Sequence, residues 1–144
     1  MLSAADAAGA VTEDATLPSL SDTGTITFDD VDLSDGHSAT VANALTNQLG
    51  GVLQAVVTDT ATGAGNGTVT WTYEVANAAV QYLAEGETAT ETFTVRIEDN
   101  DGGFIDQTII VTVTGTNDGP TISAADAAGA VTEDASNPTL SDTG

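Results

Sequence analysis

The segment Thr68–Val75, with the sequence TVTWTYEV, decides the fold of this chain. Apolar side chains occupy every second position of it, and threonine or glutamate fills the positions between. Because successive side chains of a strand point to opposite faces, this pattern predicts a half-buried strand whose inner face carries Val69, Trp71, Tyr73 and Val75. We therefore interpret Trp71 and Tyr73 as core residues and not as a platform for stacking sugars.

Shorter stretches with similar alternation lie on both sides of this segment. We predict strands at Thr25–Phe28, Ser38–Val41, Val52–Val57, Thr92–Glu98 and Gln107–Thr114, with an early one around Val11. The residues from Ala78 to Leu83 favour one helical turn, and Asn66-Gly67 favours a tight turn before the Trp71 strand. About seven strands within about 110 residues predict an all-β protein, an immunoglobulin-like antiparallel β-sandwich.

The sequence also contains a duplication with an offset of 120 residues. Ser3–Gly24 and Ser123–Gly144 are identical at 19 of 22 positions. Such a repeat predicts an array of stacked units, with one complete unit over residues 1–120 and the start of the next over residues 121–144. We expect this partial copy to be disordered, or to exchange strands with another copy of the chain.

The charge balance excludes several classes of function. The 144 residues include 22 Asp or Glu, one Arg (Arg96), no Lys and no Cys, for a net charge of −21. Nucleic-acid binding needs a basic surface, which is missing, and no run of about 18 apolar residues is present to insert into a membrane. Because 40% of the residues are apolar and many alternate with polar ones, we expect a folded protein.

The acidic residues gather at the ends of the predicted strands. Two neighbouring like charges repel by roughly 1 kcal/mol even at the dielectric constant of water, and a single arginine cannot relieve many such pairs. Ca²⁺ can relieve them, because it takes about six to eight oxygen ligands in flexible geometry. We therefore predict calcium ligands among Glu13, Asp14, Asp30, Asp32, Asp35, Glu85, Glu87, Asp99, Asp101, Asn117 and Asp118.

An up-and-down strand order divides these residues between two ends of a sandwich. The loop at residues 29–35 is expected beside Asp99 and Asp101, with the Glu13 turn and the segments 85–87 and 117–118 at the opposite end. EF-hand loops are excluded, because loops starting at Asp30 or Asp99 would have Val41 or Ile110 as the final ligand. Two other interpretations stay open: a solvated acidic surface, or a protein adapted to high salt.

Five motifs in this order resemble the VCBS-type repeat of large secreted bacterial adhesins of the RTX type. They are VTEDA from Val11, TGTITFDDVDLSDGH from Thr23, GTVTWTYEV from Gly67, NAAVQYLAEGETATETFTVRIEDNDGG from Asn77 and TVTGTNDGP from Thr112. The resemblance covers residues 11–120 and restarts at Val131.

The resemblance implies a cadherin-like sandwich that serves as an extender, a stalk module whose fold and junctions with neighbouring repeats are rigidified by Ca²⁺. It also implies an extracellular, cell-surface location after type I secretion from a bacterium. By analogy with cadherins, the ligands at the junction with the following repeat match Glu13, Glu85 or Glu87, Asn117 and Asp118. Those at the junction with the preceding repeat match Asp30, Asp32, Asp99 and Asp101.

Two other functions compete with the extender. A module that binds a glycan or a host surface would need an exposed aromatic platform, but most of the six aromatic residues fall on predicted inner faces. We do not expect an enzyme, because a glycosidase needs two carboxylates across a cleft, and no cleft is indicated. His37, the only histidine, is interpreted as a solvated loop residue.

Overall fold

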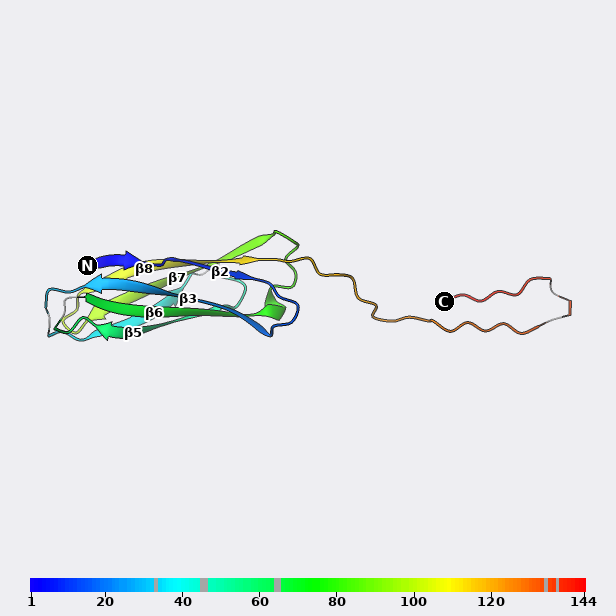
Figure 1. Ribbon diagram of the computed structural model, residues 1–144, viewed down its shortest axis with the longest axis horizontal. Helices are drawn as coiled ribbons and strands as arrows, with labels where there is room; N and C mark the ends of the chain where they lie inside the picture. Colours follow the sequence, from blue (N-terminus) through cyan, green and yellow to red (C-terminus); the bar gives the residue numbers. More distant parts are fainter. Residues whose placement is uncertain (33, 45–46, 64–65, 134, 137) are drawn as a thin grey trace.

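The computed structural model covers residues 1–144 and describes all of them except 33, 45–46, 64–65, 134 and 137. The described residues form eight strands and one short 3₁₀ helix (Figure 1). In chain order these are β1 (Leu2–Ala5), β2 (Ala8–Thr12), β3 (Ser19–Asp29), β4 (His37–Asn43), β5 (Val52–Thr60), β6 (Asn66–Ala76), η1 (Asn77–Ala79), β7 (Thr88–Asp99) and β8 (Phe104–Thr114). The predicted all-β fold is confirmed.

The strands make two sheets that pack face to face. One sheet has the order β1-β3-β6-β5 and the other β2-β8-β7-β4, so the first two strands are each the edge of a different sheet. Every strand pair is antiparallel except β2 with β8, which is parallel. The sequence predicted only antiparallel pairs. The exception arises because the chain crosses from one sheet to the other between Ala5 and Ala8.

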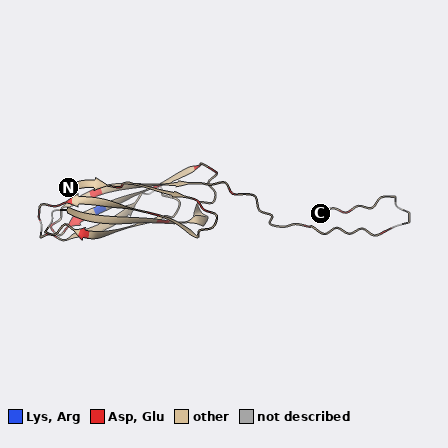
Figure 2. Cartoon of the chain, in the orientation of Figure 1, with Lys and Arg blue, Asp and Glu red and all other residues tan. Residues whose placement is uncertain are grey.

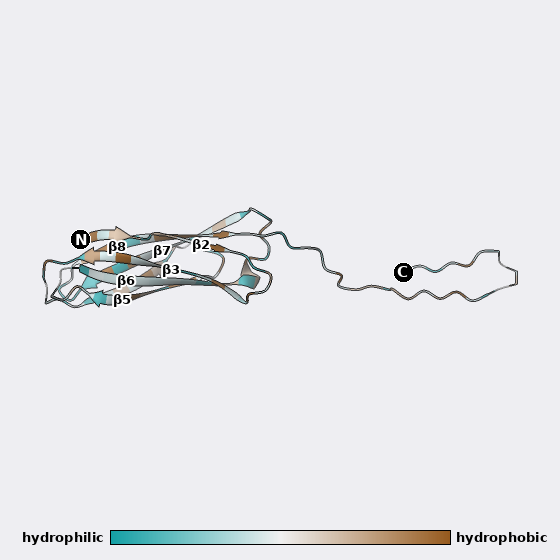
Figure 3. Cartoon of the chain, viewed as in Figure 1, coloured by the Kyte–Doolittle hydropathy of each residue, from teal (hydrophilic) through white to brown (hydrophobic). Residues whose placement is uncertain are grey.

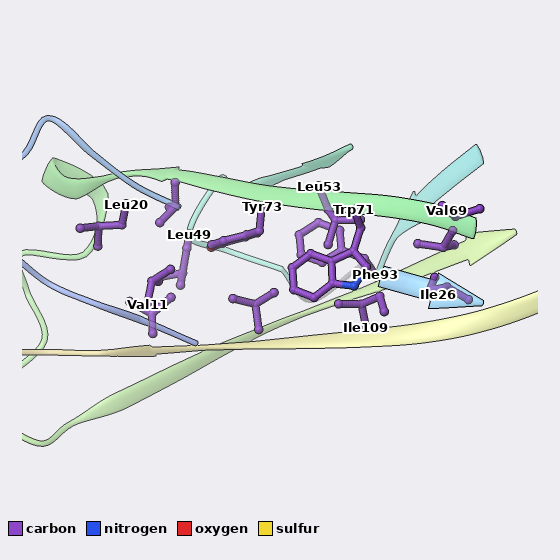
Figure 4. Close-up of a cluster of buried hydrophobic side chains, with 14 of the residues drawn as sticks. Val11, Leu20, Ile26, Leu49, Leu53, Val69, Trp71, Tyr73, Phe93 and Ile109 are labelled. Carbon is purple, nitrogen blue, oxygen red and sulfur yellow. The ribbon is translucent and has the colours of Figure 1, made fainter. Parts of the chain in front are cut away.

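The core lies between the sheets and follows the predicted alternation. Val69, Trp71 and Tyr73 have no exposed surface, and the facing strands β7 and β8 bury Phe93 and Ile109 as completely (Figure 4). Burial of each such side chain stabilises the fold by roughly 1.5–3 kcal/mol. Trp71 and Tyr73 are therefore core residues, as predicted, and Figure 3 shows the apolar segments concentrated in the strands of the sandwich.

The structure corrects two local predictions. Asn66-Gly67 is not a turn but the start of β6, and a Cβ on Gly67 would lie only 2.2 Å from the Phe28 ring. The glycine is needed there for close packing, while positive φ occurs earlier, at Ala61 (64°) and Gly63 (80°). The helical turn expected at residues 78–83 is shorter and earlier, as η1.

The two copies of the duplicated segment have different structures. Ser3–Gly24 supplies β1, β2 and the first half of β3, whereas the described residues after Thr114 contain no helix or strand. These C-terminal residues leave the sandwich where β8 ends and fold back on themselves (Figure 1). None of the helices formed by the described residues is long and apolar enough to cross a membrane.

Candidate metal centre

Three carboxylates meet at one end of the sandwich, which we call the Asp30 end. One oxygen from each of Asp30, Asp35 and Asp99 lies within 4.8 Å of the other two. Asp30 directly follows β3, Asp35 precedes β4, and Asp99 ends β7. These elements belong to both sheets, and acidic residues are visible at this end beside the N-terminus (Figure 2).

Backbone donors orient two of the three carboxylates. The Oδ1 atom of Asp99 accepts hydrogen bonds from the N–H groups of Asp101 (2.9 Å) and Gly103 (2.7 Å), so the β7–β8 turn wraps around it. A Cβ on Gly103 would come within 2.3 Å of the other Asp99 oxygen, which explains the glycine. The Oδ1 atom of Asp30 similarly accepts the N–H of Asp32 at 2.9 Å.

His37 is part of this centre, contrary to the prediction of a solvated loop residue. Its side chain is only 5% exposed and packs against the Phe28 ring at 4.8 Å between centroids. Nε2 lies 2.8 Å from Asp30 Oδ2, and Nδ1 lies 2.7 Å from the carbonyl oxygen of Thr60. No local pattern predicts this contact, because the β3–β4 loop has to fold before His37 reaches Asp30.

Asp35 carries the unrelieved charge of the cluster. Among the described residues its carboxylate accepts no hydrogen bond. Partial burial and then the charges of Asp101, Asp32, Asp30 and Asp99 raise its pKa. The Asp32 N–H and the His37 ring instead lower the pKa of Asp30. The ionised form of Asp35 is therefore the one that gains most from a bound cation.

The lone arginine does not neutralise this cluster. Arg96 makes two hydrogen bonds with Asp106, of 2.7 and 2.8 Å, and its guanidinium lies 3.9 Å from the centre of the Phe104 ring. An open depression of about 370 Å³ lies beside the cluster, with Asp30, His37 and Asp99 among its lining residues. Hard carboxylate oxygens next to an open surface suit Ca²⁺, which accepts water as part of its coordination shell.

The other two acids predicted for this end are not in the cluster. Asp32 and Asp101 are exposed, and neither carboxylate belongs to the group of close ligand atoms. They contribute instead through their backbone N–H groups, which hold Asp30 and Asp99. Five acids were thus placed at the correct end from sequence, and three of them, Asp30, Asp35 and Asp99, meet.

The opposite end, which we call the Glu13 end, is built differently. Glu13 is 3% exposed, and its Oε2 accepts the N–H of Thr116 at 2.9 Å, while its Oε1 is buried and has no hydrogen-bond partner among the described residues. The backbone of the residue 84–87 turn joins Gly115 through hydrogen bonds to Glu87 (2.8 Å) and Gly86 (3.1 Å). These segments therefore meet, as predicted.

Their acidic side chains do not converge as a ligand set. Among the described residues, no three carboxylates come together at this end. Asp14 accepts hydrogen bonds from the N–H and hydroxyl of Thr16, which lower its pKa, and Glu87 accepts the N–H of Ala84. The three remaining predicted ligands are exposed: Glu85, Asn117 and Asp118.

One buried acid, Glu91, is not predicted by the strand pattern as we assigned it. Glu91 has no exposed surface, and it accepts hydrogen bonds from the Tyr73 hydroxyl (2.8 Å) and the Leu49 N–H (3.1 Å). Burial and this carboxylate raise the pKa of Tyr73. The alternation that placed Phe93 and Val95 inward would have found Glu91 if it had been extended two residues earlier.

A comparison with protein-family models finds no match, and neither does a comparison with curated proteins. Among solved structures, the CooA pilin subunit from enterotoxigenic Escherichia coli is similar at a TM-score of 0.49 and 12% identity, over 76% of this chain and 90% of the pilin. The periplasmic chaperone SfaE is similar at a TM-score of 0.38 and 13% identity, over 76% of this chain and 55% of the chaperone. These likenesses reach no further than the β-sandwich architecture.

Proposed function

We propose that this chain is a calcium-stabilised extender module of a secreted bacterial cell-surface adhesin, of the VCBS type. Ca²⁺ would be held by Asp30, Asp35 and Asp99, and the chain would do no chemistry. The observation that carries the proposal is the convergence of these three carboxylates in a protein whose one arginine is bound elsewhere. An extracellular location after type I secretion belongs to the same proposal and rests on the motif resemblance.

A cation at this position would join the two sheets. Asp30 extends from β3 in one sheet, whereas Asp99 ends β7 in the other. A shared ion would therefore resist separation of the sheets at the Asp30 end. Neutralising the carboxylates would also offset the charge repulsion that, after partial burial as the larger cause, raises the pKa of Asp35. Both effects favour the folded state, which is what a stalk under mechanical load requires.

The positions of the chain ends suit a linear array. The N-terminus lies at the Asp30 end, and the chain leaves β8 at the Glu13 end (Figure 1). Consecutive units joined in this way follow one another along the long axis of the sandwich. The partners we propose are therefore neighbouring repeats, with the Glu13 end of one unit facing the Asp30 end of the next.

The glycan-binding alternative has no aromatic platform to support it. Phe28, Trp71, Tyr73 and Phe93 are buried, and only Tyr82 and Phe104 are exposed. Tyr82 lies near the Glu13 end and Phe104 at the Asp30 end, where Arg96 covers its ring. Two separated rings cannot stack against one sugar.

Thermal unfolding in EDTA, CaCl₂, MgCl₂ and NaCl at matched ionic strength tests the proposal. Free Ca²⁺ at about 100 times Kd should add about 2.7 kcal/mol of stability per site. The Asp35→Asn variant should lose most of this gain, because it removes one of the three proposed ligands, whose carboxylate accepts no hydrogen bond among the described residues. The matched control is Glu74→Gln, which removes one charge from an exposed position on β6. Equal stabilisation by all salts, or an unchanged calcium response in Asp35→Asn, would contradict the proposal.

A further inference from the structure

We infer that the parallel pair of β2 and β8 is a mechanical clamp, meaning the contact that sets the force at which the sandwich opens when the chain is pulled along its long axis. The direction of this pull rests on the proposed stalk function. The strength of the clamp does not depend on calcium, because backbone hydrogen bonds and buried side chains form it.

A load along the long axis has to pass through these two strands. The chain reaches the sandwich at the Asp30 end, ahead of β1 and β2, and it leaves from β8 at the Glu13 end (Figure 1). Strands β3 to β7 lie between β2 and β8 in the sequence. As long as β2 and β8 stay paired, they connect the two loaded ends directly, and the intervening strands cannot be drawn out.

Parallel pairing places this contact in shear. β2 and β8 both run from the Asp30 end to the Glu13 end, with Ala8 opposite Ile110 and Thr12 opposite Thr114. The load pulls β2 back toward the Asp30 end and β8 onward from the Glu13 end, so the strands have to slide past each other. Sliding strains the evenly spaced hydrogen bonds of a parallel pair all at once, whereas peeling from one end strains them one after another.

The pairing is uninterrupted and continues beyond both ends of β2. Its five residue pairs show no register shift. Ahead of β2, the Ile110 N–H donates to the Ala7 carbonyl at 3.0 Å. After it, the Glu13 N–H donates to the Thr114 carbonyl at 2.9 Å, and Glu13 Oε2 accepts the Thr116 N–H at 2.9 Å. The chain that leaves β8 is therefore bound to the chain that leaves β2 as well.

β2 and the residues just before it are also bound to the other sheet. The Ala10 N–H donates to Oδ2 of Asp22 on β3 at 2.8 Å. The Nε1 atom of Trp71 on β6 donates to the Asp6 carbonyl at 2.8 Å. Val11 lies in the core with 6% of its surface exposed (Figure 4). Sliding of β2 therefore breaks contacts with both sheets together.

β1 is the weaker of the two holds on the N-terminal part of the chain. It makes three residue pairs with β3, with a register shift between Leu2 and Ala4, and none of its residues is buried. The load reaches β1 first, because β1 precedes β2. We expect β1 to yield first and to lengthen the chain little, since it already lies along the direction of pull. The pair of β2 and β8 then bears the load.

The three carboxylates of the Asp30 end lie outside the clamp. Asp30 directly follows β3, Asp35 precedes β4, and Asp99 ends β7. A cation bound there would join the two sheets without joining β2 to β8. Failure of the calcium proposal would thus appear as an unchanged unfolding temperature in Ca²⁺, whereas failure of the clamp would appear in force measurements made in EDTA.

Two directions of pull on single molecules of the full chain test the clamp. For the lengthwise pull, handles are attached to the N-terminus and to Asp118→Cys. For the peeling pull, they are attached to Ala15→Cys and Asp118→Cys, both exposed and both in segments that follow the Glu13 end of β2 or β8. The chain has no cysteine of its own, so these attachment points are unique.

The lengthwise pull in EDTA should need a severalfold higher force than the peeling pull. It should then draw out residues 8–114 together, which adds roughly 350 Å at about 3.3–3.6 Å per residue. An equal or lower force for the lengthwise pull would overturn the inference. Both introduced cysteines lie outside the strands, so this comparison does not depend on a variant with an altered core.

Two matched core substitutions separate mechanical from thermal stability. Val11→Ala shortens a buried side chain of β2, and Val69→Ala does the same in β6, an inner strand of the other sheet. Both should lower the unfolding temperature, because each leaves a cavity. Forced unfolding is governed by the unfolding barrier, so the lengthwise force should fall in Val11→Ala and stay near that of the unmodified chain in Val69→Ala. A force in Val11→Ala that is not below that of Val69→Ala would contradict the clamp.

Discussion

The two ends of the sandwich use the same residue type for different purposes. At the Glu13 end, one carboxylate is buried and bound by the Thr116 N–H, so it fastens the end of β8 to β2. At the Asp30 end, three half-buried carboxylates face one another, and the backbone satisfies only some of their oxygens. A buried carboxylate that accepts a backbone hydrogen bond therefore serves the fold, whereas carboxylates that lie close to one another can serve as the ligands of a cation.

The pKa values of Asp14, at the Glu13 end, and Asp35, at the Asp30 end, shift in opposite directions. Hydrogen bonds from Thr16 lower the pKa of Asp14 beside Glu13, whereas partial burial and then neighbouring charges raise the pKa of Asp35. The folded state therefore favours the ionised form of Asp14 and disfavours the ionised form of Asp35. A cation reverses only the second of these effects.

The largest expected effect is at the Glu13 end. Glu13→Ala should reduce the free energy of unfolding by roughly 2–3 kcal/mol, because it leaves the Thr116 N–H without its charged acceptor. Urea unfolding in EDTA would measure this loss, with exposed Glu85→Ala as a control that should change stability by less than about 0.5 kcal/mol. A loss that appears only in calcium would mean that Glu13 acts as a ligand instead.

At the Asp30 end, Asp35→Asn should raise stability in EDTA at neutral pH. The folded-state pKa of Asp35 is raised above 3.8, so its stabilising contribution is present below that value and is lost as the pH rises through the folded-state pKa. The gap between variant and wild type should therefore close as the pH falls toward 3.8. Thermal unfolding across this pH range checks it, and a gap independent of pH would refute the charge explanation.

Asp14→Ala should show the opposite dependence. The folded-state pKa of Asp14 lies below 3.8, so its contribution is present above that value and is lost as the pH falls through the lowered pKa. The variant should be less stable than wild type at neutral pH, and the difference should shrink in acid. If the difference grew in acid, the hydrogen bonds from Thr16 would not be its cause.

The smallest effect is expected from Arg96→Gln. The arginine binds Asp106 on the surface and does not reach the three carboxylates, so the calcium-dependent shift in unfolding temperature should stay the same. Its small stability loss should fade with added salt, because exposed ion pairs are screened. A calcium response that strengthened markedly without Arg96 would show that the arginine already competes for the site.

The sequence predicted those features that depend on local periodicity. The alternation around Trp71, Phe93 and Ile109 identified the strands and their inner faces, and an up-and-down order was enough to place Asp30 near Asp99. It did not predict β1 or the parallel pairing of β2, because both depend on a crossover between sheets that leaves no periodic signal. The duplicated segment shows the same limit, since the identical stretches 3–12 and 123–132 form parts of two strands in the first copy and no strand in the second.

The site was predicted less completely than the fold. Turn geometry decides which of the acids meet. The backbone N–H groups of Asp32 and Asp101 donate hydrogen bonds to the carboxylates of Asp30 and Asp99, and these bonds orient the two carboxylates. His37 could not be assigned to the centre, because its contacts with Asp30 and Thr60 join three separate segments.

Amide chemical shifts followed during a calcium titration would test the central claim most directly. The account predicts that shifts concentrate in residues 30–37 and 99–103, saturate together, and disappear in Asp35→Asn. Mg²⁺ at the same ionic strength should not reproduce them. Shifts spread evenly over the acidic surface, or confined to the Glu13 end, would contradict a calcium centre built from Asp30, Asp35 and Asp99.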